Sequence, residues 1–279
     1  MFSIRVMTRD DLDLVLRWAA TEGWNPGLGD ADAFHAADPG GFLMGFVGTE
    51  PVTAISVVAH DEAYGFLGFY ICRPEQRGRG YGWQTWQAGM ARLGKRVIGL
   101  DGVVAQQENY RRSGFALAHR NIRFSGRVAA GPPRDSRLVP VTEALLPAIR
   151  AYDTRHVPAD RTAFLDVWLG GGGERQAIAL LSDGAVHGFG VIRPAVTGFK
   201  IGPLFADGPM EADLLFRALA AKAGGAPLFL DVPEPNAASL DLARRHGLAP
   251  VFETARMYRG PAPALPLHKI FGITSFELG

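Results

Sequence analysis

The stretch QRGRGYG, residues 76–82, places three glycines and two arginines in seven positions, shortly after an apolar run that ends at Cys72. Glycine disfavours a helix or strand interior, where each one costs roughly 0.5–1 kcal/mol relative to alanine. The apolar run YGFLGFYIC, residues 64–72, predicts a buried strand, and WQTWQAGMARL, residues 83–93, predicts a helix. The glycine stretch is therefore expected to be a loop between a strand and the N-terminus of a helix.

A loop of this kind offers a site for a phosphate or a pyrophosphate. Its backbone N–H groups and those of the first helical turn form a concave array of donors, and the helix dipole adds partial positive charge. Arg77 and Arg79 add full charges that can pair with phosphate oxygens. A flexible surface turn that binds nothing is the alternative.

A dinucleotide-binding loop is a second alternative, and the spacing argues against it. Such a loop requires G-x-G-x-x-G and an acidic residue about 20 positions further on. Asp101 stands near that distance, but the glycines occupy positions 78, 80 and 82, and Pro74 separates the strand from the loop. We therefore reject the dinucleotide interpretation.

The residues from Cys72 to Gly82 resemble the acetyl-CoA loop of the GNAT N-acetyltransferases, whose pattern is R/Q-x-x-G-x-G/A. Further on, YRRSGF, residues 110–115, matches the family's Y-x-x-x-G-F at the end of a helix. The resemblance implies that the loop binds the pyrophosphate of acetyl-CoA and that the end of the strand lines the thioester. The implied acetyl-CoA contacts are Ile71, Cys72, Arg77, Gly78, Arg79, Gly80, Tyr81 and Gly82.

The second half of the chain carries a partial copy of the pattern. NAASLDLARRHGL, residues 236–248, resembles the family's N-x-x-A-x-x-x-Y-x-x-x-G-F segment, with Ala243 where the tyrosine would stand. In the first half the tyrosine is present, but Val103 takes the place of the asparagine. ADGPMEA, residues 206–212, stands where the second glycine loop would be and lacks its spacing. The chain thus resembles a tandem GNAT protein with an intact N-terminal copy, a degenerate C-terminal copy and one active site.

The order of expected elements repeats along the chain. GRVAAGPPRDSRLVP, residues 126–140, is rich in glycine and proline and is predicted to link two halves. The first half is expected to close with separate strands in FALAHR, residues 115–120, and IRFSG, residues 122–126. We expect an α+β fold of two tandem GNAT-like domains, residues 1–128 and 137–279. Each would have a mixed, mostly antiparallel central sheet flanked by helices.

The resemblance implies direct attack of a primary amine on the thioester of acetyl-CoA in a ternary complex. The amine must be neutral, the oxyanion needs donors, and the departing thiolate needs a proton. Tyr110 matches the family's proton donor to the sulfur, and a core tyrosine that closes the helix is the alternative. A nucleophilic Cys72 is disfavoured against a small apolar wall residue, because direct transfer needs no acyl-enzyme.

The acceptor site is expected in the loop TEGWNPG, residues 21–27, because GNAT proteins commonly shape it between their first two helices. Glu22, Trp24 and Asn25 combine an acid, an indole and an amide that suit a cationic amine, and Glu22 is the candidate general base. A structured turn is the alternative. A small-molecule amine and a protein amino group both remain open as acceptors.

Composition limits the other classes. The 279 residues are 47% hydrophobic and carry a net charge of +1, which gives no sign of a nucleic-acid or membrane partner. A single cysteine and an N-terminus without an export signal lead us to expect a cytoplasmic protein. No metal-ligand spacing is present, so we expect no metal. The C-terminal domain is expected to wall the acceptor site or to form a homodimer contact. A non-catalytic acyl-CoA-binding regulatory or scaffold protein is the alternative function.

Overall fold

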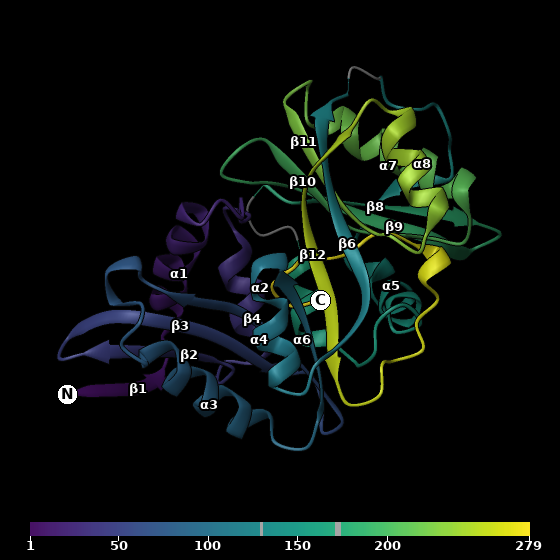
Figure 1. Ribbon diagram of the computed structural model, residues 1–279. Helices are drawn as coiled ribbons and strands as arrows, with labels where there is room; N and C mark the ends of the chain where they lie inside the picture. The colour runs from purple at the N-terminus through teal and green to yellow at the C-terminus, as the bar shows by residue number, and fades with distance from the viewer. Residues whose placement is uncertain (129–130, 171–173) are drawn as a thin grey trace.

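The computed structural model describes residues 1–128, 131–170 and 174–279 (Figure 1). The first half contains β1 (Phe2–Val6), α1 (Arg9–Thr21), α2 (Asp30–Ala37), β2 (Phe42–Val47), β3 (Glu50–Ala59), β4 (Tyr64–Cys72), α3 (Tyr81–Leu93), β5 (Val97–Val103), α4 (Gln107–Arg112) and β6 (Ala116–Arg127). Helix α1 begins with a capping box, in which Thr8 and Asp11 each accept a hydrogen bond from the other's backbone N–H.

The second half repeats this order. It contains β7 (Leu138–Pro140), α5 (Leu146–Asp153), α6 (Thr162–Leu169), β8 (Gln176–Ser182), β9 (Ala185–Pro194), β10 (Phe199–Ala206), α7 (Pro209–Lys222), β11 (Pro227–Pro233), α8 (Ala237–Arg245), β12 (Ala249–Arg259) and β13 (Ile270–Gly272). Among the described strands, the parallel pairs are β4 with β5 and β10 with β11, and the remaining pairs are antiparallel. The predicted fold class, a mostly antiparallel sheet flanked by helices in each half, is confirmed.

The two halves exchange their closing strands. β12 of the second half lies between β5 and β6, and β6 of the first half lies between β12 and β11. These two long strands run side by side through the middle of the molecule, and the C-terminus lies near them in the same view (Figure 1). The prediction of two separate closing strands was wrong, because β12 pairs with β6 on both sides of Asn121 and holds it as one strand. The division at residues 128 and 137 stays a prediction about the chain, while the sheet itself is continuous across it.

Helices α2 and α6 join the halves through a shared core. Phe34 of α2 stacks on Phe164 and Trp168 of α6, with ring centroids 6.5 and 6.1 Å apart. Asp30 of α2 pairs with Arg193 of β9 at 3.0 Å, and both side chains are almost completely buried. Because removing one partner of a buried ion pair leaves an uncompensated charge, this contact ties the halves together strongly.

The parallel pairs differ between the halves where their strands diverge. β4 pairs with β5 only from Tyr64 to Leu67, and beyond Leu67 the strand β5 continues beside β12 alone. β10 likewise stops pairing with β11 after Ile201. There β13 fills the space, since it pairs with β10 at Leu204 and Phe205 and the N–H of Ile273 donates to Asp231 O at 2.9 Å. The second half is therefore closed by its own chain at the position where the first half is open.

Candidate active site

A cavity of about 350 Å³ lies where β4 and β5 diverge. Its first-half walls come from β4, β5, the loop after α1, and α4, and its second-half walls come from β12 and the C-terminal segment. The residues that line it include Glu22, Trp24, Leu67, Phe69, Ile71, Cys72, Arg77, Asp101, Tyr110, Phe252, Phe276 and Glu277. Both halves thus complete one cavity.

The wall formed by β4 contains a backbone irregularity. Phe69 has φ of +44°, a left-handed conformation that is rare for a bulky residue. The pairing register with β3 shifts at the same place, between Ala54 and Ser56. Because β5 no longer pairs with β4 beyond Leu67, this edge of β4 presents its backbone polar groups to the cavity. Such groups are the donors that an acyl carbonyl or an oxyanion requires.

The glycine loop has the geometry of an anion cradle. Gly78 and Gly80 have φ of +77° and +80°, and a Cβ at either position would meet no atom within 4 Å. Gly80 is the N-cap of α3 and provides no side chain to cap it, so the first N–H groups of this helix are available to a ligand. Among the described residues, Arg79 forms no ion pair. Tyr81 stacks on Phe2, with ring centroids 4.8 Å apart, so its ring braces the loop against β1.

Arg77 is the contact between the loop and the cavity. Its Nε donates to the carbonyl of Cys72 at 2.9 Å, and its Nη2 donates to Glu22 Oε1 at 2.5 Å. Glu22 therefore lines the cavity in a salt bridge with a residue of the predicted acetyl-CoA loop. No local pattern in the sequence indicates that these two residues are partners.

Tyr110 lies at the wall of the cavity with 8% of its surface exposed. It stacks on Trp86 at a centroid distance of 5.7 Å. Burial, and then the neighbouring Tyr70, raise the pKa of the Tyr110 hydroxyl above its usual range. The hydroxyl therefore stays protonated at neutral pH, as a proton donor must.

Cys72, the last residue of β4, also lines the cavity. Burial raises the pKa of its thiol, and Arg77 and the N–H of Gly82 oppose that change. A thiol with a raised pKa holds little thiolate at neutral pH, which agrees with a wall residue rather than a nucleophile. Ile71 precedes it in β4 and is buried against the cavity.

Trp24 and Asn25 follow Glu22 in the loop and are placed differently from each other. Trp24 lines the cavity. Asn25 has φ of +50° and binds the backbone of Thr197 twice, donating to its carbonyl at 3.1 Å and accepting from its N–H at 2.8 Å. Asn25 thereby fastens the loop to the second half and is not among the residues that line the cavity.

Three further cavity residues were not predicted. Asp101 accepts hydrogen bonds from Arg256 at 2.9 and 2.6 Å and from Asn121 at 2.8 Å, so all of its charge is engaged. Phe276 and Glu277 come from the C-terminal segment. Phe276 and Glu277 lie in the segment GITSFELG, residues 272–279. No local sequence pattern connects this segment to a cavity lined mostly by residues of the first half.

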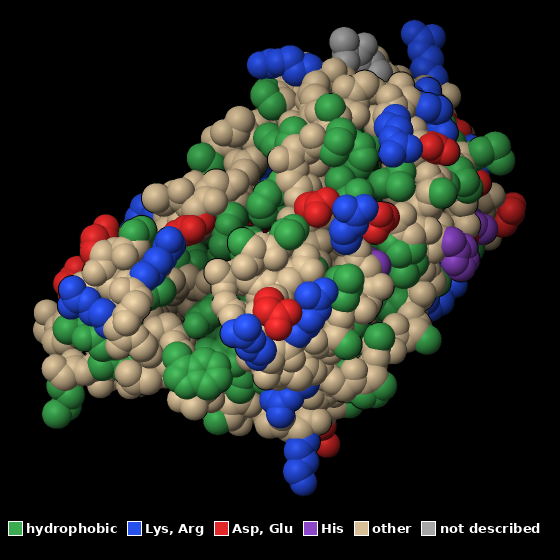
Figure 2. All heavy atoms as spheres, viewed as in Figure 1, with side chains coloured by type: hydrophobic (Ala, Val, Ile, Leu, Met, Phe, Trp, Pro, Cys, Tyr) green, Lys and Arg blue, Asp and Glu red, His purple; other side chains and the backbone are tan. Residues whose placement is uncertain are grey.

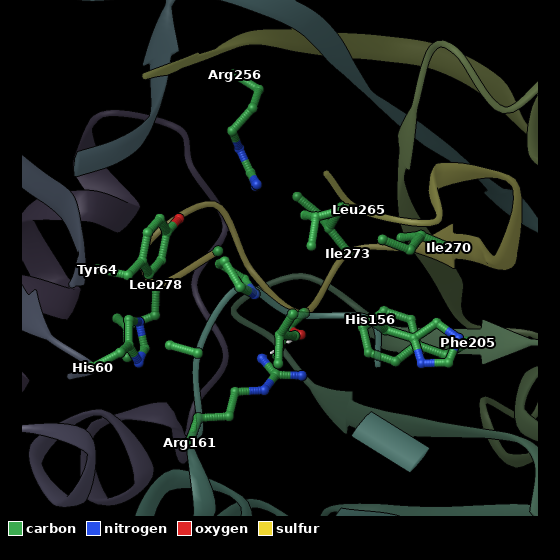
Figure 3. A pocket seen from close by; sticks show the side chains of 15 residues that line it. His60, Tyr64, His156, Arg161, Phe205, Arg256, Leu265, Ile270, Ile273 and Leu278 are labelled. Atoms are coloured by element: carbon green, nitrogen blue, oxygen red, sulfur yellow. Dashed lines mark hydrogen bonds between the residues drawn. The ribbon is translucent and has the colours of Figure 1, made fainter. Parts of the chain in front are cut away.

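A second cavity, of about 40 Å³, lies between the halves behind the C-terminal segment. In Figure 3, Tyr64 and His60 approach it from the first half, and Arg161 and His156 from the second. Arg161 is held by Asp153 at 2.8 and 2.6 Å. A volume of this size holds about one water molecule, so this cavity is not a substrate site.

Two family models match the chain. Residues 10–116 match the acetyltransferase (GNAT) family, and residues 149–272 match a second acetyltransferase (GNAT) domain model. The holothin acyltransferase of Pseudoalteromonas sp. (strain SANK 73390) is 32% identical over 271 residues, which cover 97% of this chain and 92% of that protein. The chain belongs to the GNAT family of acyltransferases. The alternative of a non-catalytic scaffold gives way to an enzyme that transfers acyl groups.

Solved structures agree with this GNAT fold. A Pyrococcus horikoshii protein assigned to the acetyltransferases has a TM-score of 0.82 at 21% identity and covers 100% of this chain and 96% of its own. A tandem GNAT protein from the clavulanic acid biosynthesis pathway has a TM-score of 0.65 at 13% identity and covers 94% and 100%. The predicted tandem arrangement of two GNAT domains is confirmed.

Three further observations concern charge, membrane spans and metal ligands. Basic and acidic side chains are interspersed over the face shown in Figure 2, in keeping with a net charge of +1. Within residues 1–128, 131–170 and 174–279, no helix has the length and apolar character needed to span a membrane. The same residues contain no cluster of three or more His, Cys, Asp or Glu side chains that would hold a metal ion.

Proposed function

We propose that this GNAT acyltransferase moves the acetyl group of acetyl-CoA to a primary amine by direct attack in a ternary complex. The observation that carries the proposal is the cavity where β4 and β5 diverge, which is lined by Arg77 at the start of the glycine loop, by Tyr110 and Glu22, and by aromatic residues of the second half. Its volume of about 350 Å³ lies in the range of small-molecule sites.

The residues present fit acetyl-CoA as the acyl donor. Gly78 and Gly80 leave open space above the loop, where a side chain would obstruct the approach of a pyrophosphate. Arg77 and Arg79 would supply charge to the phosphates, and the edge of β4 around Ile71 would supply backbone hydrogen bonds to the pantetheine arm. Once bound, acetyl-CoA supplies the activated thioester.

Residues of the chain would then stabilise the oxyanion, donate a proton to the sulfur and contact the acceptor. The backbone of β4 at Phe69 would stabilise the oxyanion, and the hydroxyl of Tyr110 would give a proton to the departing sulfur. Glu22, beside Arg77, and Trp24 would contact the acceptor. Direct transfer leaves Cys72 without a covalent role, in agreement with the raised pKa of its thiol.

We propose further that each chain has one active site, in the first half. Two features of the second half support this. β13 fills the place where β10 and β11 diverge. Asp207 stands where the glycine loop would begin, and it pairs with Lys269 at 3.0 Å and His187 at 3.0 Å. A carboxylate at this position would repel a pyrophosphate rather than bind it.

Holothin is the first acceptor to test, because a relative that matches 97% of the chain is named a holothin acyltransferase. The experiment incubates the full chain with acetyl-CoA and a panel of amines that includes holothin, amino sugars, amino acids and a lysine peptide. Released CoA thiol is followed with a thiol reagent, and the acetylated product is identified by mass spectrometry. Product formation with any amine supports the proposal, whereas absence of acetyl-CoA binding by calorimetry would refute it.

A further inference from the structure

The C-terminal segment, residues 273–279, crosses from the second half to the first, and its residues Phe276 and Glu277 line the larger cavity. Residues 273–278 are buried, and the carbonyl of Glu277 lies so close to β4 that a Cβ on Gly68 would approach it to 2.3 Å. The N–H of Leu278 donates to Ser275 Oγ at 3.1 Å, and the N–H of Gly279 donates to Ser275 O at 3.2 Å. These contacts fix Glu277 at the wall of the cavity.

Three carboxylates line the cavity, and their partners differ. Asp101 is fully engaged by Arg256 and Asn121, and Glu22 accepts a hydrogen bond from Arg77. Glu277 is only 3% exposed, and its Oε2 has no hydrogen-bond partner among the residues that the structure describes. Because a buried carboxylate without a hydrogen-bond partner is costly, a cationic group beside it would be stabilising.

The surroundings of Glu277 suit an organic cation. The rings of Phe252 and Phe276 lie 6.1 Å apart, and both line the cavity together with Trp24. Aromatic faces and a desolvated carboxylate together bind an ammonium group more strongly than either does alone. Arg123, whose guanidinium lies over the Phe276 ring, is paired with Asp231 at 2.6 and 2.8 Å and also attracts the charge of Glu277 without a hydrogen bond to it.

Lys200 is the cation within the protein that would compete with an acceptor ammonium for Glu277. Its side chain is 2% exposed, and its Nζ has no hydrogen-bond partner among the described residues. No salt bridge joins it to Glu277, since none is found within 4.0 Å, and Lys200 does not line the cavity. Lys200 therefore lowers the cost of burying the Glu277 charge without occupying its free oxygen.

We propose that Glu277 is the anionic end of the acceptor site, where its carboxylate pairs with the ammonium of the acceptor and takes one proton from it. This rests on the proposed amine acetylation. The neutral amine then forms the C–N bond, the C–S bond breaks, and its electron pair stays on sulfur. The second proton lost by the nitrogen is balanced by the one that the thiolate gains through Tyr110, and the proton on Glu277 passes to solvent. Glu277 would thus be a catalytic residue supplied by the second half.

The test compares two probes that differ in charge. Benzylamine is an ammonium ion at about pH 7, whereas aniline is neutral and has a similar size. Their affinities for the full chain are measured by calorimetry in the presence of CoA, for the wild type and for Glu277→Gln. We expect Glu277→Gln to weaken benzylamine binding by at least about tenfold and to leave aniline binding unchanged. If turnover is established, the same variant should lower kcat/KM for a charged amine by about 100-fold or more.

Controls separate this role from a structural one. Glu253→Gln changes a carboxylate on β12 outside the cavity and should alter neither probe. Glu277→Asp keeps the charge and should restore part of the benzylamine affinity. Acetyl-CoA affinity within about twofold of the wild type shows that the fold and the donor site are intact. Equal losses for both probes, or no loss for benzylamine, would overturn the proposal for Glu277. Cation binding without any acetyl transfer would instead contradict the proposed function alone.

Discussion

Arg77 and Glu22 lie 55 positions apart in the sequence, and a hydrogen-bonded salt bridge of 2.5 Å joins them at the mouth of the cavity. One belongs to the loop expected to bind the donor, and the other to the loop expected to bind the acceptor. Their side chains are 53% and 29% exposed, so the pair is solvated and can exchange partners at little cost. We therefore expect donor binding and the charge of Glu22 to be coupled.

This coupling predicts opposite effects of two substitutions on acetyl-CoA affinity. Glu22→Gln frees Arg77 for the pyrophosphate and should tighten acetyl-CoA binding by about two- to fivefold, the scale of an exposed ion pair. Arg77→Ala should weaken it, because a phosphate contact is lost. Calorimetric titration of the full chain measures both, with Arg73→Ala as a control cation outside the cavity. Weaker binding by Glu22→Gln would show that Arg77 does not reach the phosphates.

Tyr110→Phe removes the proposed proton donor and leaves the ring that stacks on Trp86. We expect kcat to fall by about 100-fold while the Kd of acetyl-CoA stays within about twofold. Because burial raises the pKa of Tyr110 above its usual range, its proton is retained up to about pH 10. The ratio of wild-type to variant rates should therefore be constant from about pH 6 to pH 9. An unchanged kcat in Tyr110→Phe would exclude the role.

The donor half of the site was predictable because its signals are local. The glycine loop and the YRRSGF segment each occupy a few consecutive residues, and one residue of each, Arg77 and Tyr110, lines the cavity. The positive φ of Phe69 was not predictable, since nothing in the sequence marks an aromatic residue for that conformation. It follows from the register shift against β3, which is a tertiary effect.

The acceptor half of the site depends on the exchange of strands. β12 and the C-terminal segment bring Phe252 and Glu277 to residues near position 70, and no linear pattern specifies so distant a contact. Asn25 illustrates the same point. Its residue type suits a polar site, but Thr197 of the other half engages both ends of its amide.

Cys72 should be a slow and dispensable thiol. Burial raises its pKa, so the thiolate fraction at about pH 8 is smaller than that of a free cysteine. Iodoacetamide should therefore label it more slowly than it labels glutathione, and saturating acetyl-CoA should slow labelling further. Cys72→Ala should retain at least about half of the wild-type kcat, since direct transfer forms no acyl-cysteine. Loss of nearly all turnover in that variant, or an acetylated Cys72 in intact-mass spectra, would contradict direct attack.

Because β13 fills the place where β10 and β11 diverge, we predict that each chain binds one acetyl-CoA. Calorimetric titration of the full chain should reach saturation at a ratio of about one, and Gly80→Val should abolish the signal, since φ of +80° excludes a β-branched residue there. Gly224→Val is a control at another positive-φ turn, far from the cavity, with φ of +57°. A ratio of about two, or binding that persists in Gly80→Val, would place a donor site in the second half.

Lys200 gives a prediction for stability against pH. Burial, followed by Arg123, lowers the pKa of its ammonium from 10.5 to about 8. Because the folded-state pKa lies below the unfolded one, the unfolded chain binds more protons between these values, so stability rises with pH in this window. The cost of burying the charged Lys200 ammonium is therefore full below about pH 8 and vanishes above about pH 10.5.

Comparing wild type with Lys200→Met cancels the other titrations. The difference between their unfolding free energies should shift by on the order of 3 kcal/mol across the window, in favour of wild type. Urea unfolding at several pH values measures it, with Lys95→Met, at an exposed position, as the control. A difference that does not change with pH would show that Lys200 keeps an ordinary pKa in the folded protein.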